Sequence, residues 1–128
     1  MSAWTDDELR HIGGVTEIQL APRRSDGTLR TYMTMWVVSV EDELYVRSAG
    51  GQDRPWYRHA LATGTGRIRA GGVEREVIFD AADPGVHEAI DASYHAKCDR
   101  YGPGPVSHVT GPDAHSVTIR LVHTDHAD

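Results

Sequence analysis

The fold class is decided by the segment Leu29-Arg-Thr-Tyr-Met-Thr-Met-Trp-Val-Val-Ser-Val40, which is followed by Glu41-Asp-Glu43 and Leu44-Tyr-Val-Arg47. Threonine, tyrosine, tryptophan and valine are enriched in β-strands because their branched or flat side chains pack well on a pleated surface. The acidic triplet indicates a turn, so the sequence predicts one long strand over 29–40 and a returning strand over 44–47. Such a hairpin indicates an antiparallel sheet.

Further strands are expected on both sides of this hairpin. In chain order they are Val15–Ala21, Thr65–Ala70, Val73–Phe79, the weaker Val106–Thr110, and Ser116–Val122. Gly71-Gly72 is typical of a two-residue hairpin turn. With about six strands in so short a chain, closure into a small barrel protects the sheet edges best. A flat sheet with helices on one face is the competing architecture.

Two to three helices are expected to flank this sheet, which makes the fold class α+β. Their expected ranges are about 5–12, 56–62 and 85–101. Thr5 and Glu8 form a capping box for the first. Pro55 suits the first position of the second, with Asp53 as its candidate cap. Asp83-Pro84 opens the third, and Gly102-Pro-Gly-Pro105 ends it.

Length and composition narrow the class of protein. A chain of 128 residues and 14.1 kDa is expected to form a single domain over 1–128. Its uncharged stretches, such as Thr31–Val40, are too short to cross a bilayer. The first residues are acidic and form no apolar signal region, so a cytoplasmic protein is expected. Cys98 is the sole cysteine, which excludes an intramolecular disulfide and a cysteine cluster for zinc.

The charge distribution is uneven along the chain. The formal net charge of −6 argues against a nucleic-acid-binding protein. Between Pro22 and Ala70, however, eight arginines face five acidic residues, a net of +3. Lys97 is the sole lysine beside twelve arginines, a bias that codon usage in a GC-rich genome explains by itself. Guanidinium forks nevertheless suit phosphate or carboxylate.

Two stretches carry a family resemblance. The first is Arg23-Arg-Ser-Asp-Gly-Thr-Leu-Arg30, and the second is Ser48-Ala-Gly-Gly51 followed by Pro55-Trp-Tyr-Arg-His-Ala-Leu-Ala62. Together they resemble the deazaflavin-dependent nitroreductases, a branch of the FMN-binding split β-barrels. In that family a basic Arg/Lys-Ser-Gly segment precedes the first long strand, and a Ser-x-Gly-Gly loop and a Pro-x-Trp-Tyr helix start follow the next. The later pattern Tyr94, Lys97, Asp99-Arg-Tyr101 is similar to a smaller family known as a domain of unknown function.

The chain departs from the family pattern at several positions. Asp26 replaces the glycine after the serine, and it places a carboxylate where the family binds phosphate. His59 and Ala60 stand where the family has asparagine and leucine. Thr63-Gly64 replaces the Asn-Pro that usually ends the helix. These departures leave it open whether a cofactor is bound at all.

The resemblance implies an antiparallel split β-barrel, usually a homodimer, that binds the deazaflavin F420 or FMN and reduces a small organic molecule. It implies a phosphate site formed by Arg23, Arg24, Ser25 and Arg30, and a cofactor frame formed by Ser48, Gly50, Gly51, Trp56 and Tyr57. The alternative function is a cofactor-free small-molecule binding protein or a nonredox enzyme on the same barrel. From the residues alone, the arginine loop is better explained as solvated, and Trp56 as a core anchor.

Tyr94, Lys97 and Tyr101 are the candidate catalytic residues. Spacings of three and four place them on one stripe of the predicted long helix. A lysine beside two phenols could polarise a substrate or relay a proton. The alternative interpretation is a snorkelling lysine with two tyrosines at the margin of the core.

Eight histidines raise the question of a metal site. His87, Asp91 and His95 share one helix face, but the first and last lie about 12 Å apart along the axis, too far for one ion. A solvated helix face explains them better, and His108 and His115 are expected to have no function. The sequence therefore predicts no metal site.

Overall fold

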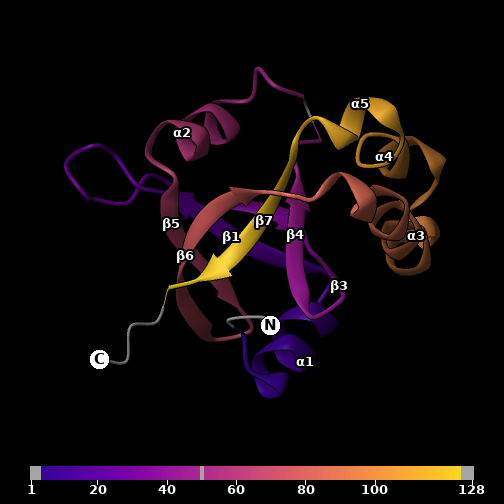
Figure 1. Cartoon of the computed structure of the whole chain (residues 1–128), viewed down its shortest axis with the longest axis horizontal. Helices are drawn as coiled ribbons and strands as arrows, with labels where there is room; N and C mark the ends of the chain where they lie inside the picture. The colour runs from indigo at the N-terminus through magenta and orange to yellow at the C-terminus, as the bar shows by residue number, and fades with distance from the viewer. Residues whose placement is uncertain (1–3, 50, 125–128) are drawn as a thin grey trace.

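The computed structural model describes residues 4–49 and 51–124. In that part of the chain the elements are α1 (Asp6–Gly14), β1 (Glu17–Pro22), β2 (Met33–Trp36), β3 (Val38–Val40), β4 (Glu43–Arg47), α2 (Pro55–Thr63), β5 (Thr65–Ala70), β6 (Val73–Ala81), α3 (His87–Cys98), α4 (Pro103–Ser107), α5 (Pro112–His115) and β7 (Thr118–His123). Short 3₁₀ turns, Pro84–Val86 and Asp99–Tyr101, flank α3. Figure 1 shows the strands wrapped around one another, with α1 at one end, α2 at the other, and α3 to α5 on one side.

Seven described strands form one sheet in the order β2-β1-β5-β6-β7-β4-β3. Every pairing in this sheet is antiparallel. Strands β2 and β3 are consecutive in the chain yet lie at opposite ends of the strand order, so the sheet curls into a nearly closed barrel. The predicted α+β antiparallel barrel is confirmed, with seven strands rather than about six.

The core has two parts. Alternate residues of the strands, such as Ile18, Leu20 and Ile68, point inward and fill the barrel. On the outer face of β3 and β4, α3 buries Ile90 and Tyr94 against a second apolar cluster. Helix α3 is thereby fixed to one wall of the barrel, where the candidate site lies.

Gly66 lies at a close approach between strands. A Cβ atom there would lie 2.5 Å from the carbonyl oxygen of Ala21 and 2.7 Å from the ring of Phe79. Both neighbours belong to packed strands of the barrel, so neither can move aside without a large energetic cost. Glycine is required at this position for space.

The prediction of one long strand over 29–40 is wrong, and Val37 shows why. Its N–H donates to the carbonyl oxygen of Thr16 at 3.2 Å, at the start of β1. Its own carbonyl accepts a hydrogen bond from Lys97 Nζ at 2.6 Å. The chain therefore leaves its partner β1 at this residue and pairs with β4, which splits the predicted strand into β2 and β3.

Other predicted elements also differ. The weak strand over 106–110 is wrong, because Pro103 takes the first turn of α4 and the chain coils there instead. The predicted helix over 85–101 is α3 with its two 3₁₀ turns. Asp53 does not cap α2, whose N-cap is Arg54, and Asp83 sits at the predicted cap position without a side-chain capping bond. The capping box at the start of α1 is confirmed.

Candidate functional site

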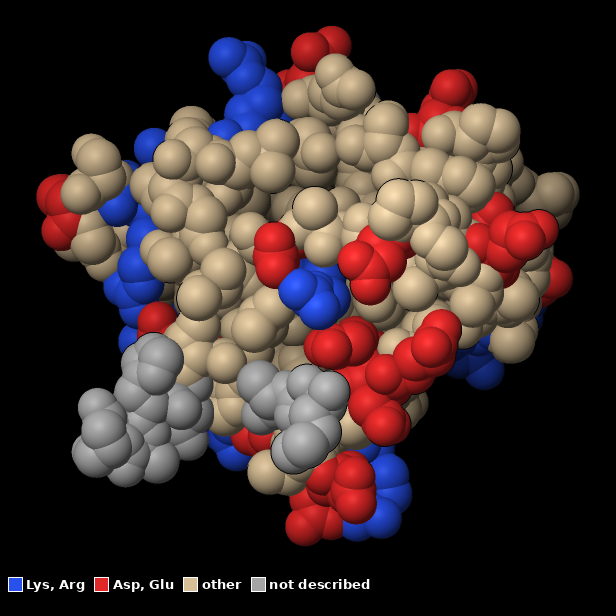
Figure 2. Space-filling model, in the orientation of Figure 1, with Lys and Arg blue, Asp and Glu red and all other residues tan. Residues whose placement is uncertain are grey.

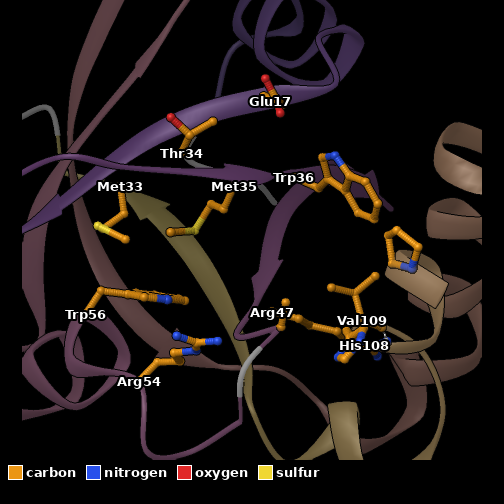
Figure 3. Close-up of a pocket in the computed structure, with 12 residues that line it drawn as sticks. Glu17, Met33, Thr34, Met35, Trp36, Arg47, Arg54, Trp56, His108 and Val109 are labelled. Carbon is orange, nitrogen blue, oxygen red and sulfur yellow. Dashed lines mark hydrogen bonds between the residues drawn. The ribbon is translucent and has the colours of Figure 1, made fainter. Parts of the chain in front are cut away.

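A cleft of about 480 Å³ opens between β2, the loop that leads into α2, and α4 (Figure 3). Its apolar lining consists of Met33, Met35, Trp36, Ala49, Trp56, Pro105 and Val109. Its polar lining consists of Glu17, Thr34, Arg47, Arg54 and His108. A mostly apolar cleft with a few polar groups and this volume is typical of a small-molecule site.

Aromatic side chains stand at both ends of the cleft. Figure 3 shows Trp56 and Arg54 at one end, Trp36 and His108 at the other, and Met35 between them. Trp56 is held by its place in the first turn of α2. Trp36 is held by a stacked contact with Tyr101, at 5.6 Å between ring centroids. The cleft thus offers flat, polarisable walls to a ring-shaped ligand.

Arg54 is an available cation at the cleft. Its guanidinium has no hydrogen-bond or ion-pair partner among residues 4–49 and 51–124. The side chain is exposed, and the residue is fixed by its backbone as the N-cap of α2. An unpaired guanidinium beside an apolar cleft favours a ligand that carries an anionic group.

Arg47 forms a wall of the cleft in a different way, because its own side chain is buried. Its Nε donates to Thr118 Oγ1 at 2.8 Å. Its Nη1 donates to Asp91 and, at 2.7 Å, to the carbonyl oxygen of Val109. Its Nη2 lies 3.3 Å from His87 Nδ1 and 3.4 Å from the His87 carbonyl oxygen. All five N–H groups of the guanidinium therefore have an acceptor.

Asp91 is the counter-charge of Arg47. Its Oδ2 also lies 3.1 Å from His115 Nε2 and 3.4 Å from the Gly111 amide. Burial alone would raise the pKa of Asp91, but the hydrogen bonds from Arg47 and His115 outweigh it and lower that pKa. The rings of His87 and His115 stack at 4.5 Å between centroids. We call Arg47, His87, Asp91 and His115 the arginine network.

Comparison with known proteins identifies the family. The family described as "Uncharacterized protein conserved in bacteria (DUF2255)" matches residues 8–121. The chain belongs to the DUF2255 family. The predicted resemblance to a domain-of-unknown-function family is thereby confirmed. No curated protein matches this DUF2255 chain.

Three solved structures share the fold of the DUF2255 chain. One is titled "F420 Reductase", with a TM-score of 0.59, 22% identity, and coverage of 94% of this chain and 96% of that chain. A putative pyridoxamine 5'-phosphate oxidase from Listeria innocua gives a TM-score of 0.63, 16% identity, and coverage of 94% and 93%. A conserved hypothetical protein from Mycobacterium tuberculosis gives 0.60, 14%, and coverage of 94% and 81%. The predicted split-barrel fold is confirmed.

Only part of the predicted cofactor frame of the DUF2255 chain lies at the cleft. Trp56 lines it, and so does Ala49 of the Ser48–Gly51 loop. Ser48 is buried, and its hydroxyl donates to the Gly51 carbonyl oxygen at 2.6 Å. Tyr57 is buried and donates to the Ser116 carbonyl oxygen at 3.2 Å. Gly50 lies outside the described residues.

The predicted phosphate loop lies away from the cleft, and most of its donors are already used. Arg23 donates to Glu76 and to the Gly27 carbonyl oxygen. Arg24 donates to Thr28 Oγ1 at 3.2 Å and to the Leu29 carbonyl oxygen at 2.8 Å. The first two arginines of this loop are therefore already engaged, Arg23 partly by Glu76 of β6 and Arg24 by acceptors within the loop.

The remaining polar groups of this loop belong to Ser25, Asp26 and Arg30, and each has a different environment. Asp26 accepts from both the amide and the hydroxyl of Thr28, and these hydrogen bonds lower its pKa. Ser25 is exposed. Arg30 keeps a buried Nε atom that has no partner within residues 4–49 and 51–124. Asp26 thus stabilises the turn of the loop, while Arg30 remains available to a ligand.

Basic groups gather where this loop meets α2. The pKa of His59 is lowered, first by burial and then by the nearby guanidinium groups of Arg30, Arg58 and Arg24. No acidic group contributes to this shift. Figure 2 shows Lys and Arg side chains along the edge of the molecule beside the 23–29 loop, whereas acidic side chains gather below β3 and β4. This edge attracts anions.

The three predicted catalytic residues do not meet at one point. Tyr94 is fully buried, and its hydroxyl has no hydrogen-bond partner among the described residues. Lys97 Nζ donates to the carbonyl oxygens of Gly13 at 2.9 Å and Val37 at 2.6 Å, and burial lowers its pKa. Tyr101 is exposed and stacks on Trp36. None of the three lines the cleft directly.

Sequence reasoning missed Arg54, Met33, Met35 and Trp36 as cleft residues, and it missed the arginine network. One signal for the network was present, since Arg47 ends the strand predicted over 44–47, whose other residues are apolar. The pairing of His87 and Asp91 on one helix face was noticed but interpreted as solvated. Among residues 4–49 and 51–124, no cluster of three or more His, Cys, Asp or Glu could hold a metal ion. No helix in the same part of the chain could span a membrane.

Proposed function

We propose that this chain binds an F420- or FMN-type cofactor in the cleft and acts as an oxidoreductase on a small organic molecule. The observation that carries the proposal is the pairing of aromatic walls, Trp36 and Trp56, with the unpartnered cation Arg54 in one cleft of about 480 Å³. A flavin-type ring is flat and its side chain is anionic, which matches this combination. The titles of two structures with the same fold, an F420 reductase and a pyridoxamine 5'-phosphate oxidase, support it.

The residues of the chain would hold and orient the cofactor, which supplies the hydride chemistry when bound. Trp56 and Met35 would pack against the ring, and the Ser48–Gly51 loop would frame it with Tyr57 behind. Arg54 would pair with an anionic group. Tyr101 would act on the substrate through its position beside Trp36, while Tyr94 and Lys97 would support the walls.

The anionic end of the cofactor would extend towards the basic edge beside α2. Among the residues that the structure describes, the side chains of Arg30 and Arg58 make no hydrogen bond or ion pair, so they are the stronger candidates. Arg23 and Arg24 would contribute mainly by keeping the loop in shape, and Ser25 would add a hydroxyl donor. Replacing Arg30 with glutamine should therefore weaken binding more than the same change at Arg23.

The test is a titration of the purified protein with F420 and with FMN, followed by absorbance and fluorescence. Arg54→Gln should weaken binding by about 1.5–3 kcal/mol, the net worth of a charge-assisted hydrogen bond, which is about 10- to 150-fold in Kd. Trp56→Leu should weaken it through lost stacking. Arg10→Gln, on the exposed face of α1, is the matched control and should change nothing. No binding of either cofactor would reject the proposal.

A second candidate function is a cofactor-free small-molecule binding protein or nonredox enzyme. It is favoured by the engagement of Arg23 by Glu76 and of Arg24 by the loop itself, together with the Asp26 carboxylate in the same loop. In that case an aromatic carboxylate should bind in the cleft and quench tryptophan fluorescence, while neither flavin competes with it. Competition by FMN or F420 would instead support the first proposal.

We also propose that the chain pairs as a homodimer. Strand β2 is an edge of the sheet, and its Met33 is 45% exposed. An exposed apolar edge is commonly buried in an isologous contact. Light scattering should give about twice the 14.1 kDa of one chain at micromolar concentration, and a monomer mass would exclude the pairing.

A further inference from the structure

We propose that the arginine network is a pH-sensitive latch on the cleft, in which protonation of His87 loosens the wall formed by residues 103–111. The cleft then holds its ligand less tightly at acidic pH. The part that concerns the ligand rests on the proposed function, whereas the movement of the wall is a property of the chain alone.

The protonation state of His87 follows from its neighbour. A guanidinium has donors and no acceptor, so the 3.3 Å contact between Arg47 Nη2 and His87 Nδ1 requires Nδ1 to accept. An accepting Nδ1 carries no proton, and His87 is therefore neutral in the closed network. The ionised carboxylate of Asp91 only accepts, so His115 Nε2 is the donor in their 3.1 Å contact.

Adding a proton to His87 opposes this arrangement. The new N–H would point at the N–H groups of Arg47, and the hydrogen bond would be replaced by repulsion. The charged groups that face His87 are Arg47 from β4, Asp91 from its own helix, and His115 from α5. Asp91 favours the proton, but its carboxylate is already shared between Arg47 and His115. The stacked ring of His115 further disfavours a second cation.

The same network fixes one wall of the cleft. Arg47 holds the carbonyl oxygen of Val109, and Asp91 lies within 3.4 Å of the Gly111 amide. Val109 lines the cleft together with Pro105 and His108 of the same segment. Displacing the Arg47 head group therefore removes the hydrogen bond to Val109 that helps to hold this segment against the barrel.

The direction of the pH effect follows from linkage. Burial, then His115 and Arg47, lower the pKa of His87 below its ordinary value of 6.5. The loosened state has no such penalty, so it binds the proton more tightly than the closed state does. Loosening should thus be independent of pH above about 6.5, and its equilibrium constant should rise by up to about tenfold for each pH unit below that.

The experiment follows amide hydrogen exchange between pH 7.5 and 5, corrected for the intrinsic rate at each pH. The amides of Val106, His108 and Val109 report on the wall, because each is hydrogen-bonded within it. In the native chain their protection should fall by up to about tenfold per pH unit below about 6.5, and it should level off once the pH passes the lowered pKa of His87. In His87→Asn, whose side-chain oxygen can accept from Arg47 but cannot be protonated, this acid dependence should disappear.

His95→Gln is the matched control, since His95 lies on the same helix, is exposed, and pairs with Asp99 instead. It should keep the acid dependence of the native chain. Should His87→Asn fail to fold, the NMR titration of the His87 ring in the native chain decides, because the latch requires its pKa to match the exchange transition. Protection in the native chain that does not change with pH would overturn the latch, as would an unchanged transition in folded His87→Asn.

The ligand is tested separately with FMN and F420 as probes. Their affinity should fall more steeply between pH 7 and 5.5 in the native chain than in His87→Asn, where only the protonation of the probe's own phosphate remains. If neither probe binds at any pH, the proposed function fails, while the exchange data still decide whether the wall is latched. If a probe binds with the same pH dependence in both proteins, the latch does not control the cleft and the inference is overturned.

Discussion

Arg47 and Asp91 lie 44 residues apart in the sequence and form the ion pair that ties strand β4 to helix α3 beside the cleft. The Arg47 side chain is completely buried, and that of Asp91 is 24% exposed. A buried guanidinium needs both a counter-charge and an acceptor for each N–H group, and this site supplies them. The pair therefore sets the position of a cleft wall as well as the packing of α3.

Asp91→Ala should be strongly destabilising, because it leaves the buried guanidinium without its counter-charge. We expect the free energy of unfolding to fall by about 3 kcal/mol, the low end for buried pairs, since Asp91 is partly exposed. Urea denaturation measures this change. The control Asp7→Ala removes an exposed pair with Arg10 and should cost less than about 1 kcal/mol. Equal effects of the two changes would contradict the importance of the buried pair.

Tyr94→Phe should leave the free energy of unfolding unchanged or raise it. Among the described residues the buried hydroxyl of Tyr94 has no partner at hydrogen-bond geometry, so its removal relieves a desolvation penalty and loses at most a weak contact with the Arg47 amide. Tyr57→Phe is the matched control, because that hydroxyl donates to the Ser116 carbonyl oxygen and its loss should cost about 1 kcal/mol. Thermal denaturation compares the two variants. A clear loss of stability in Tyr94→Phe alone would show that the hydroxyl has a partner.

Lys97→Met should destabilise the fold even though methionine replaces most of the apolar stem. The change removes the donor that serves the carbonyl oxygens of Gly13 and Val37, at a cost of about 1.5–3 kcal/mol. Arg10→Met, on the exposed side of α1, tests the generic effect of losing a surface cation and should cost little. Chemical denaturation of both gives the comparison. Unchanged stability of Lys97→Met would instead favour a role for the ammonium in ligand binding.

Gly66→Ala should be destabilising by about 1–3 kcal/mol, the range for overpacking a filled interior. The added methyl group would collide with the Ala21 carbonyl oxygen and the Phe79 ring. Gly14→Ala is the opposite case, since nothing lies within 4 Å of a Cβ atom at the end of α1, and alanine has the higher helix propensity. Melting temperatures should therefore shift in opposite directions. A stabilised Gly66→Ala would show that β1 and β5 are less closely packed than described.

Local signals in the sequence predicted most elements of the fold. The Thr5–Glu8 capping box, the Gly71-Gly72 turn and Pro55 each act within a few residues, and each is found where it was expected. The break at Val37 could not be predicted in this way. It depends on Thr16 and Lys97, which are distant in sequence and become neighbours only in the folded chain.

The site was predicted less completely than the fold, for the same reason. Trp56 was found through its helix-start motif, which is local. Arg54 precedes that motif, and its importance comes from having no partner in the described part of the chain, which only the folded structure reveals. Asp91 was seen on a helix face, but its partner Arg47 belongs to another element and another motif. Pairings of this kind leave no spacing pattern in the sequence.

The single residue Val37 joins two strands at opposite ends of the sheet order, so the polypeptide itself bridges the two edges of the nearly closed barrel. A connection of a single residue has a fixed length, whereas two strands joined by a ladder of hydrogen bonds can slip in register. An inserted residue there would widen the gap between β2 and β3 and displace Trp36 from the cleft. Members of the family should therefore vary in length in exposed loops such as 23–29, whereas the link between Trp36 and Val38 should admit neither insertion nor deletion.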